Sequence, residues 1–245
     1  MHRCFINTDR LHNDLIPLGR DECRHLKNVL RIQPNDEIEL FDGAGFTRQA
    51  VIQSVEKNSI LIRPSADPVK HPEPQCSITL FCCISKGKRM DWAVEKAAEL
   101  GTTNIVPVIS ARTIVRLSNQ DRIRKAYRWR RVAIDALRQC GGSWLPDITQ
   151  PLDFSDALKL IYASSPVFTA ALSDDAINLR DAIQQIETAP ARVSWFVGPE
   201  GDFTAEELDM LRDADSVLVS LGKNILRAET AAVYGLCVLG CAFNR

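Results

Sequence analysis

The sequence predicts an α/β protein, with a parallel sheet in its C-terminal part and a smaller β-rich domain before it. From residue 77 onward, short apolar runs alternate with helical patterns, which is typical of a parallel sheet covered on both faces. Before residue 64 the apolar runs are broken by hairpin signals. Prolines at positions 64, 68, 72 and 74 separate these two patterns and indicate a linker.

The N-terminal part is expected to form a domain over residues 1–70. In "DEIELFDGAGFTRQAVIQSVEKNSILIRP" the runs are separated by Asp-Gly and Lys-Asn, which favour hairpin turns. The preceding stretch "DECRHLKNVLR" predicts one short helix. The proline-rich linker covers residues 64–75, and the second domain is expected over residues 75–245.

The second domain is predicted to alternate strands with helices along its length. The expected strands are "SITLFCCI", "NIVPVIS", "VFTAAL", "VSWFV" and "SVLVSL". The expected helices are "KRMDWAVEKAAEL", which Gly101 ends, and the segments near 119–140, 155–162, 177–187, 204–213 and 228–243. Ligands of such sheets bind beyond the carboxyl ends of the strands.

Composition excludes several classes of protein. The 245 residues are 45% apolar and 25% charged, as in an ordinary globular protein. Neither a signal peptide nor a run long enough to span a membrane is present, so we expect a cytoplasmic protein without membrane association. The eight cysteines form no C-x-x-C pair, and Cys237 and Cys241 have no histidine nearby in the sequence. We therefore expect structural cysteines and no metal site.

The stretch "VSWFVGPEGDFTAEEL" ends a predicted strand in a turn that contains two glycines. Thr204 and Glu207 have the spacing of a capping box, so a helix should follow. The turn matches neither fingerprint of a nucleotide-phosphate site. Glu200 and Asp202 would repel phosphate, which favours a neutral or cationic ligand. A tight turn without a ligand is the alternative.

A second glycine follows the strand in "SVLVSLGKNILRAETAAVYGLCVLGCAF". The helix after it is apolar nearly all round, so it should be buried against the sheet or a partner subunit. Arg227, Glu229 and Thr230 stand at its start. Charged groups at the edge of an apolar segment are costly unless they are paired or used. Arg227 and Glu229 therefore either form a structural ion pair or belong to a site.

Two clusters of basic residues suggest RNA as a partner. "DRIRKAYRWRR" holds six basic residues with Tyr127 and Trp129 between them, and "SKGKRM" adds three more. Aromatic side chains among basic ones favour RNA binding. A solvated helix face is the other interpretation. The net charge of −1 argues against a chain that is basic all over but allows such local patches.

Together, "GPEGDFTAEE" and "LGKNILRAETAA" resemble the SPOUT superfamily of methyltransferases, and within it the bacterial enzymes that methylate N3 of a uridine in 16S ribosomal RNA. The resemblance extends to "KGKRMDWAVEKAAELGTTNIVPVISART", "WRRVAIDALRQCGGSWLPDI" and "HLKNVLRIQPNDEIELFDG", and so covers nearly the whole chain. It implies an N-terminal PUA-like β-barrel and a C-terminal α/β domain with a deep trefoil knot. It also implies S-adenosylmethionine as methyl donor and a homodimer with the active site at the interface.

The resemblance implies a role for individual residues. The residues expected to line the cofactor pocket are Leu172, Gly198, Pro199, Glu200, Gly201, Leu221, Gly222, Ile225 and Leu226. Our hypothesis for catalysis is that Glu229 helps to remove the N3 proton and that Arg227 stabilises negative charge on the uracil oxygens. The expected RNA contacts are Arg24, Lys27 and Arg31 in the β-barrel, with Lys86, Arg89 and Arg130 in the second domain.

Two positions depart from the family pattern. The family commonly has arginine where this chain has Gly142, and a histidine-proline pair where Ser173-Asp174 stand. The expected substrate is 16S ribosomal RNA within the small ribosomal subunit. Alternatives are a SPOUT methyltransferase that acts on another RNA base or on ribose 2′-OH, and a non-catalytic RNA-binding protein of ribosome assembly.

Overall fold

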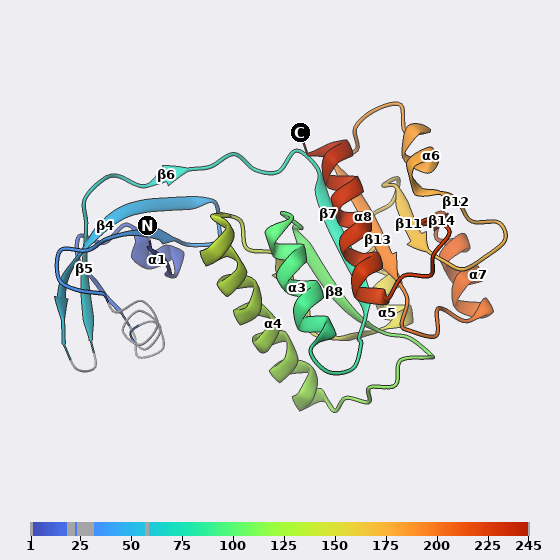
Figure 1. Cartoon of the computed structure of the whole chain (residues 1–245), viewed down its shortest axis with the longest axis horizontal. Coiled ribbons are helices and arrows are strands. Elements are labelled where there is room, and N and C mark those ends of the chain that lie inside the picture. The colour runs from blue at the N-terminus through green and yellow to red at the C-terminus, as the bar shows by residue number, and fades with distance from the viewer. Residues whose placement is uncertain (1, 19–22, 24–31, 57–58, 245) are drawn as a thin grey trace. The chain divides into compact units, whose positions relative to one another are not determined.

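A computed structural model describes residues 2–18, 23, 32–56 and 59–244. The chain forms two compact units, one of residues 1–73 with 134–145 and the other of residues 74–133 with 146–245. Figure 1 shows their elements in chain order. Within the described part of the chain, no helix is long and apolar enough to cross a membrane.

The first unit contains a six-stranded sheet in the order β1-β3-β4-β5-β2, with β6 paired to β4. Its elements are β1 (His2–Phe5), α1 (Thr8–Leu11), β2 (Ile16–Pro17), β3 (Glu37–Phe41), β4 (Phe46–Val55), β5 (Ile60–Pro64) and β6 (Val69–Lys70). Alternate residues such as Ile38, Leu40 and Ile52 point into one apolar core. The alternation of apolar and polar residues with a period of two predicted these strands from the sequence.

The Asp-Gly hairpin predicted from the sequence is confirmed. Strands β3 and β4 pair antiparallel on either side of it. The Asp42 carboxylate accepts hydrogen bonds from the amides of Ala44 (2.8 Å) and Phe46 (3.0 Å), and Gly43 takes a left-handed φ of +74°. Strands β4 and β5 also pair antiparallel, as expected. The turn at 57–58 between them, and the helix predicted over 21–31 apart from Cys23, lie outside the described residues.

The proline-rich segment contains a strand that was not predicted. Val69 and Lys70 pair antiparallel with Thr47 and Phe46 of β4. Val69, Lys70 and His71 are the only residues between Pro68 and Pro72, and proline has no amide hydrogen to extend the ladder, so the strand stays short. The backbone carbonyl of Pro72 accepts a hydrogen bond from the indole of Trp144 (2.8 Å).

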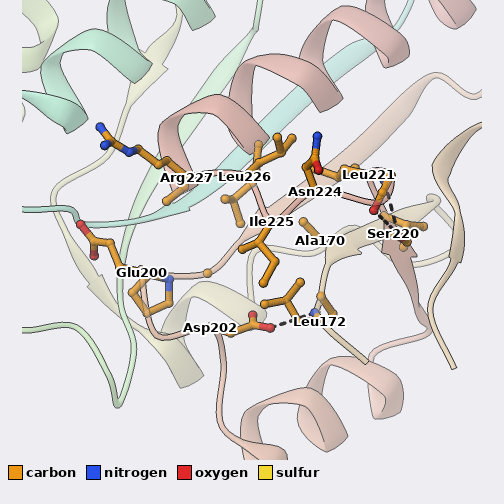
Figure 2. A pocket seen from close by; sticks show the side chains of 18 residues that line it. Ala170, Leu172, Glu200, Asp202, Ser220, Leu221, Asn224, Ile225, Leu226 and Arg227 are labelled. Carbon is orange, nitrogen blue, oxygen red and sulfur yellow. Dashed lines mark hydrogen bonds between the residues drawn. The ribbon is translucent and has the colours of Figure 1, made fainter. Parts of the chain in front are cut away.

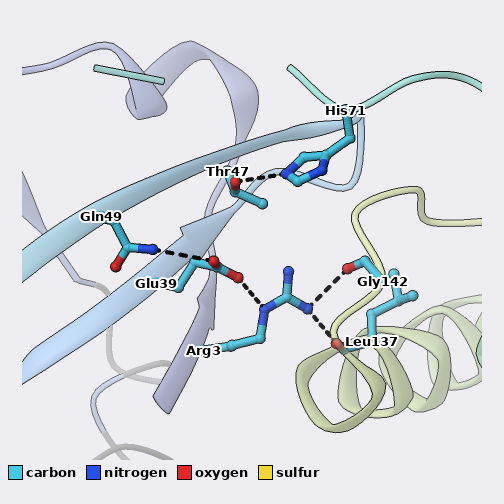
Figure 3. Close-up of polar contacts among 7 residues, drawn as sticks. All are labelled: Arg3, Glu39, Thr47, Gln49, His71, Leu137 and Gly142. Carbon is cyan, nitrogen blue, oxygen red and sulfur yellow. Dashed lines mark hydrogen bonds and ion pairs between the residues drawn. The ribbon is translucent and has the colours of Figure 1, made fainter. Parts of the chain in front are cut away.

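Arg3 joins strand β1 to the C-terminal end of helix α4 (Asn119–Cys140) within the first unit (Figure 3). Its Nη1 donates to the carbonyl groups of Leu137 (2.5 Å) and Gly142 (2.9 Å), and its Nε pairs with Glu39 (2.5 Å). The Leu137 carbonyl also accepts from the Gly141 amide (3.1 Å), so Arg3 adds a second donor at the end of the helix. The residue at 142, where the family commonly has arginine, therefore contributes its carbonyl group to this contact.

The second unit contains an eight-stranded, fully parallel sheet in the order β10-β8-β7-β13-β11-β14-β12, with β9 paired to β8. Its strands are β7 (Ser77–Cys83), β8 (Asn104–Ile109), β9 (Asp147–Ile148), β10 (Leu152–Asp153), β11 (Val167–Ala170), β12 (Ile177–Asn178), β13 (Arg192–Val197) and β14 (Ser216–Ser220). Its helices, besides α4, are α3 (Arg89–Glu99), α5 (Phe154–Leu158), α6 (Leu179–Gln184), α7 (Ala205–Asp213) and α8 (Ala228–Phe243). The predicted parallel sheet is thus confirmed.

Helices cover both faces of this sheet (Figure 1). Helix α8 packs on β7 and β13 and beside α3. On the other face, Phe154 of α5 and Leu211 of α7 share a core with Phe81 and Phe196, whose rings stack 4.1 Å apart on neighbouring strands. Burial on both faces explains why these strands are continuous apolar runs in the sequence.

Two predicted helices are shorter than expected. The helix near 155–162 ends at Leu158. The helix near 177–187 begins only at Leu179, because residues 177–178 pair with β14 and the Asn178 side chain caps the helix by accepting from the Arg180 amide (2.9 Å). Periodicity does not reveal such a tertiary pairing of two residues.

The capping box at the start of α7 is confirmed. The Thr204 hydroxyl accepts from the Glu207 amide (3.2 Å), and the Glu207 carboxylate accepts from the Thr204 amide (3.0 Å). Glu207 is buried, and its other oxygen accepts from the Ala111 amide beyond β8 (2.7 Å). The cap therefore also fixes the turn after β13 to the neighbouring loop.

Candidate active site

Three loops that follow the adjacent strands β13, β11 and β14 enclose a cavity of about 270 Å³ (Figure 2). It lies at the carboxyl ends of the parallel strands, where the sequence placed it. Eight of the nine residues expected in the cofactor pocket line it, together with Arg227: Leu172, Gly198, Pro199, Glu200, Leu221, Gly222, Ile225 and Leu226.

Gly201 is the expected pocket residue that does not line the cavity. Its carbonyl group accepts a hydrogen bond from Arg112 Nη1 (2.6 Å), and an added Cβ would meet the Arg112 side chain. Arg112 also donates to the Phe203 carbonyl (3.1 Å). Gly201 therefore belongs to the outer side of the turn. The sequence could not show this, because the side of a tight turn that each residue faces depends on the backbone dihedral angles.

Asp202 is a functional candidate that sequence reasoning left out of the pocket. Its Oδ2 accepts from the Leu172 amide (2.9 Å) in the loop after β11, and its Oδ1 accepts from the Phe203 amide (2.8 Å). It has a left-handed φ of +59°, which aspartate tolerates better than most residues. One carboxylate thus joins two of the three loops that line the cavity. Figure 2 shows the bond between Asp202 and Leu172.

Apolar side chains stand open in the cavity. Leu172 is 65% exposed and Ile225 is 77% exposed, although both line the cavity. Large apolar side chains in a concave site are typical of a pocket for a flat, apolar group. The other lining residues that the sequence did not single out are mostly small: Ala170, Ala171, Val197, Val219, Ser220, Asn224, Ala228 and Ala231.

The two glycine positions of the pocket have different physical causes. Gly222 has a φ of +125°, which side chains rarely adopt. Gly198 has no such φ, but an added Cβ would lie 3.1 Å from Asp202 Oδ1 and 3.3 Å from the Phe203 ring. Gly222 is therefore favoured by its backbone conformation, and Gly198 by close packing.

Arg89 at the start of α3 connects two acidic residues of the site. Its Nη1 pairs with Glu200 (2.7 Å), and its Nε lies 3.9 Å from Glu229 Oε1. Glu229 is the more buried acid, with 13% of its side chain exposed against 38% for Glu200. Arg89 therefore holds the loop after β13 beside the start of α8.

Glu229 retains one carboxylate oxygen without a partner. Its Oε2 is buried, and no described residue donates a hydrogen bond to it. Glu229 itself does not line the cavity, whereas Arg227 and Ala228 before it do. Burial raises the pKa of the nearby Cys82 thiol to about 12, and the charges of Glu229 and Glu200 add to the shift. That thiol is neutral and does not act as a nucleophile at ordinary pH.

The ion pair between Arg227 and Glu229 that the sequence left open is not present, because Glu229 pairs with Arg89 instead. Arg227 is exposed at the N-cap of α8 and lines the cavity. Lys86 and Arg130 are also exposed, but neither lines the cavity. The remaining expected RNA contacts, Arg24, Lys27 and Arg31, lie outside the described residues.

The Ser173-Asp174 departure lies just outside the cavity. The Ser173 hydroxyl donates to Asp175, and this bond, with an ion pair to Arg212, holds the pKa of the Asp175 carboxyl below its usual value. Neither Ser173 nor Asp174 lines the cavity, whereas Leu172 before them does. The chain thus contributes the Leu172 side chain and the residues before it to the pocket at this point.

The cysteines differ partly from expectation. Five are buried, but Cys140, Cys237 and Cys241 are exposed. Among the residues that the structure describes, no group of three histidine, cysteine or acidic side chains could hold a metal ion. Exposure of Cys237 and Cys241 follows from their place on the outer face of α8, which a sequence pattern of apolar residues all round does not reveal.

Comparison with known proteins identifies both parts of the chain. Residues 71–240 match the model of an RNA methyltransferase domain, and residues 18–65 match that of an RNA methyltransferase PUA domain. Ribosomal RNA small subunit methyltransferase E of Rickettsia conorii is 30% identical over 239 residues, covering 95% of this chain and 92% of the relative. The Bacillus subtilis protein of the same name is 26% identical and covers 98% and 96%.

Solved structures agree. Ribosomal RNA small subunit methyltransferase E from Neisseria gonorrhoeae, bound to S-adenosylmethionine, is 32% identical with a TM-score of 0.89, covering 98% of this chain and 97% of that one. A methyltransferase from Legionella pneumophila in complex with the same cofactor is 29% identical with a TM-score of 0.89 and the same coverage. By its sequence, its parallel α/β fold and its pocket at the strand ends, the chain belongs to the RNA methyltransferase family, with an N-terminal PUA domain.

Proposed function

We propose that this protein transfers a methyl group from S-adenosylmethionine to N3 of a uridine in 16S ribosomal RNA. The RNA substrate is proposed to be the one assembled within the small ribosomal subunit. The family and the names of the relatives support ribosomal RNA of the small subunit as the substrate. The choice of N3 rests on the resemblance of the two loop motifs, and the residue proposed to act on the N3 proton is Glu229, whose Oε2 has no hydrogen-bond partner among the described residues.

The pocket fits this cofactor. Exposed Leu172 and Ile225 offer apolar contacts to an uncharged adenine. Glu200 and Asp202, which would repel a phosphate, suit a cofactor with a sulfonium cation and no phosphate. Backbone at Gly222 lets a ligand approach closely. The cofactor supplies a methyl group already activated for transfer, so the chain has to position the acceptor and manage its charge.

Glu229 is proposed as the group that takes the N3 proton. Its free oxygen would receive that proton while the nitrogen lone pair becomes available. As the proton leaves, negative charge develops on the uracil oxygens, and the cationic Arg227 at the cavity wall would stabilise it. Arg227 is suited to this because no carboxylate among the described residues pairs with it.

Arg89 is proposed to position Glu229. Its sequence neighbours suggested an RNA contact, but its guanidinium is engaged by Glu200 at 2.7 Å and faces Glu229 at 3.9 Å. Arg89 therefore orients the Glu229 carboxylate from one side and the Glu200 carboxylate from the other. Contact with RNA remains proposed for Lys86, Arg130 and the three basic residues of the PUA domain.

A homodimer is also proposed, in the cytoplasm where ribosomal subunits are found. Helix α8 leaves Tyr234 43% exposed, and Cys237 and Cys241 are exposed on the same helix. An apolar helix face of this kind favours burial against a second subunit. Sedimentation of the purified protein would show a mass of two chains, and a single-chain mass at micromolar concentration would contradict the dimer.

The function is tested by nucleoside identification. Purified protein, S-adenosylmethionine and unmodified small ribosomal subunits are incubated, and the RNA is digested and analysed by mass spectrometry. We expect 3-methyluridine. A methyl group on another base or on ribose would make it an RNA methyltransferase of different specificity. A protein that fails to bind S-adenosylhomocysteine in calorimetry would be a non-catalytic RNA-binding protein.

A further inference from the structure

Helix α4 carries an exposed group of side chains that the catalytic proposal does not use. Tyr127 is 62% exposed and Ile123 is 54% exposed. The helix neighbours of Tyr127 at the spacings of three and four residues are Ile123, Arg124, Arg130 and Arg131, and all are exposed. These five residues form one surface, here called the Tyr127 face.

Burial on the opposite side of α4 fixes the direction of this face. Trp129 is 1% exposed and Ala133 is fully buried, so they anchor the helix in the protein. Lys125 extends over the Trp129 ring, with its Nζ 5.5 Å from the ring centroid. Of the two aromatic residues interleaved with basic ones in the sequence, Trp129 is therefore structural and Tyr127 is available.

The arginines of α4 divide into two sets. Arg122 pairs with Asp153 (2.8 Å), Arg128 pairs with Asp91 of α3, and Arg138 pairs with Asp135 (2.7 Å). In contrast, none of the carboxylates in the described parts of the chain pairs with the three arginines of the Tyr127 face. The unpaired arginines are the ones that surround the exposed tyrosine.

The acidic residues of α4 lie outside this surface, although Asp121 is close enough to Arg124 to interact with it electrostatically. The helix has two, Asp121 and Asp135. Asp121 accepts a hydrogen bond from the Ser118 hydroxyl (2.6 Å), and Asp135 pairs with Arg138. Neither belongs to the Tyr127 face. It is therefore a cationic surface with an aromatic ring at its centre.

We propose that the Tyr127 face binds an unpaired, single-stranded segment of the RNA substrate, with a base stacked on the Tyr127 ring and phosphates held by Arg124, Arg130 and Arg131. A nucleotide supplies both a planar base and a phosphate in each repeat, which matches an aromatic ring with arginines around it. Double-stranded RNA offers its phosphates but keeps its bases stacked in the helix. The inference rests on the proposed function only in taking RNA as the substrate.

The test measures binding of a fluorescent 12-nucleotide oligouridylate, and of a duplex of the same length, by anisotropy at several salt concentrations. Tyr127→Ala should weaken binding of the single strand about tenfold and change binding of the duplex less than twofold. Tyr127→Phe keeps the ring and should bind as the wild type. Arg124→Ala and Arg131→Ala should each reduce the salt dependence of single-strand affinity by roughly 0.7 in slope.

Two exposed residues away from α4 provide matched controls. Tyr162→Ala removes a tyrosine that is 50% exposed, and Lys159→Ala removes a lysine whose side chain is 73% exposed. Both should leave RNA affinity unchanged. Binding of S-adenosylhomocysteine, which uses the separate pocket, should be unchanged in every variant and shows that each is folded.

Several outcomes would overturn the inference. They are a Tyr127→Ala protein that binds the single strand within twofold of the wild type, a wild type that does not bind oligouridylate, and a polyglutamate peptide that competes as well as the oligonucleotide. The last would mean that charge alone accounts for binding. A wild type that binds RNA through Tyr127 but produces no 3-methyluridine would instead contradict the proposed function and leave this inference standing.

Discussion

Asp202 provides a test of how the cavity is held together. Its carboxylate accepts the Leu172 amide across two loops at 2.9 Å. A hydrogen bond to a charged group contributes about 1.5–3 kcal/mol, and the exposure of Leu172 places this bond near the lower value. Since 1.4 kcal/mol corresponds to a factor of ten, loss of the bond should reduce the fraction of protein with both loops in place by up to about tenfold.

The choice of substitution follows from the backbone. Asp202 has a φ of +59°, so alanine would add a left-handed strain of roughly 1–2 kcal/mol to the loss of the bond. Asp202→Gly removes the carboxylate and accepts this conformation. Asp202→Asn also tolerates it and keeps an acceptor oxygen without the charge. Comparing glycine with asparagine therefore separates loss of the acceptor from loss of charge.

Calorimetric titration with S-adenosylhomocysteine measures the effect. Asp202→Gly should raise the Kd about tenfold, and Asp202→Asn about threefold, because neutral hydrogen bonds have roughly half the strength of charged ones. The melting temperature of the glycine variant should fall by no more than about 3–6 °C. An Asp202→Gly protein that binds with wild-type affinity would refute the reasoning, since the loops would then keep their positions without the carboxylate.

Four further predictions concern other parts of the site and core. Glu229→Gln should reduce methyl transfer by about 10²–10⁴-fold while S-adenosylhomocysteine still binds, and full turnover would contradict its role as base. Arg89→Gln should lower kcat, whereas Arg89→Lys keeps a cation beside Glu229 and should partly restore kcat; an unchanged kcat would exclude the positioning role. Gly235→Ala should destabilise the protein by about 1–3 kcal/mol in thermal unfolding, because the added Cβ would overlap the fully buried Trp195 ring. Gly240→Ala in the same helix adds a Cβ with no atom within contact distance, so it should stabilise the protein. Burial raises the pKa of Cys82 to about 12, so Cys82 should resist iodoacetamide at pH 8 and pH 10 in the folded protein, while the exposed Cys140 reacts. The thiol of the unfolded chain ionises above about pH 9. The contribution of Cys82 to the free energy of unfolding should therefore fall as the pH rises from about 9 toward 12.

Much of the fold could be predicted because local patterns carry it. Alternating residues such as Ile38 and Leu40 predicted strands of the PUA domain, and continuous apolar runs predicted the buried parallel strands. Thr204 and Glu207 predicted the start of α7 because a capping box acts within four residues. The domain limits at residues 70 and 75 and the trefoil knot stay predictions.

The sequence missed features that depend on contacts between distant residues. The two-residue strands β6 and β12 form only because another strand offers a free edge, and no local pattern marks them. Likewise, sequence proximity suggested Arg227 as the partner of Glu229, whereas Arg89, which is 140 residues away, is the partner observed. Arg227 is the N-cap of α8 and has extended dihedral angles, so it precedes the helix that carries Glu229.

By itself, the sequence determined the two-part architecture, the parallel sheet and the family, because apolar periodicity and loop motifs are local properties of the chain. Only the tertiary structure decided how the acidic turn is used. It placed Gly201 outside the cavity, Asp202 across two loops, and Arg89 between Glu200 and Glu229. The physical reason is that hydrogen bonds and ion pairs act over a few ångströms in space, and the fold brings those atoms together from loops far apart in the chain.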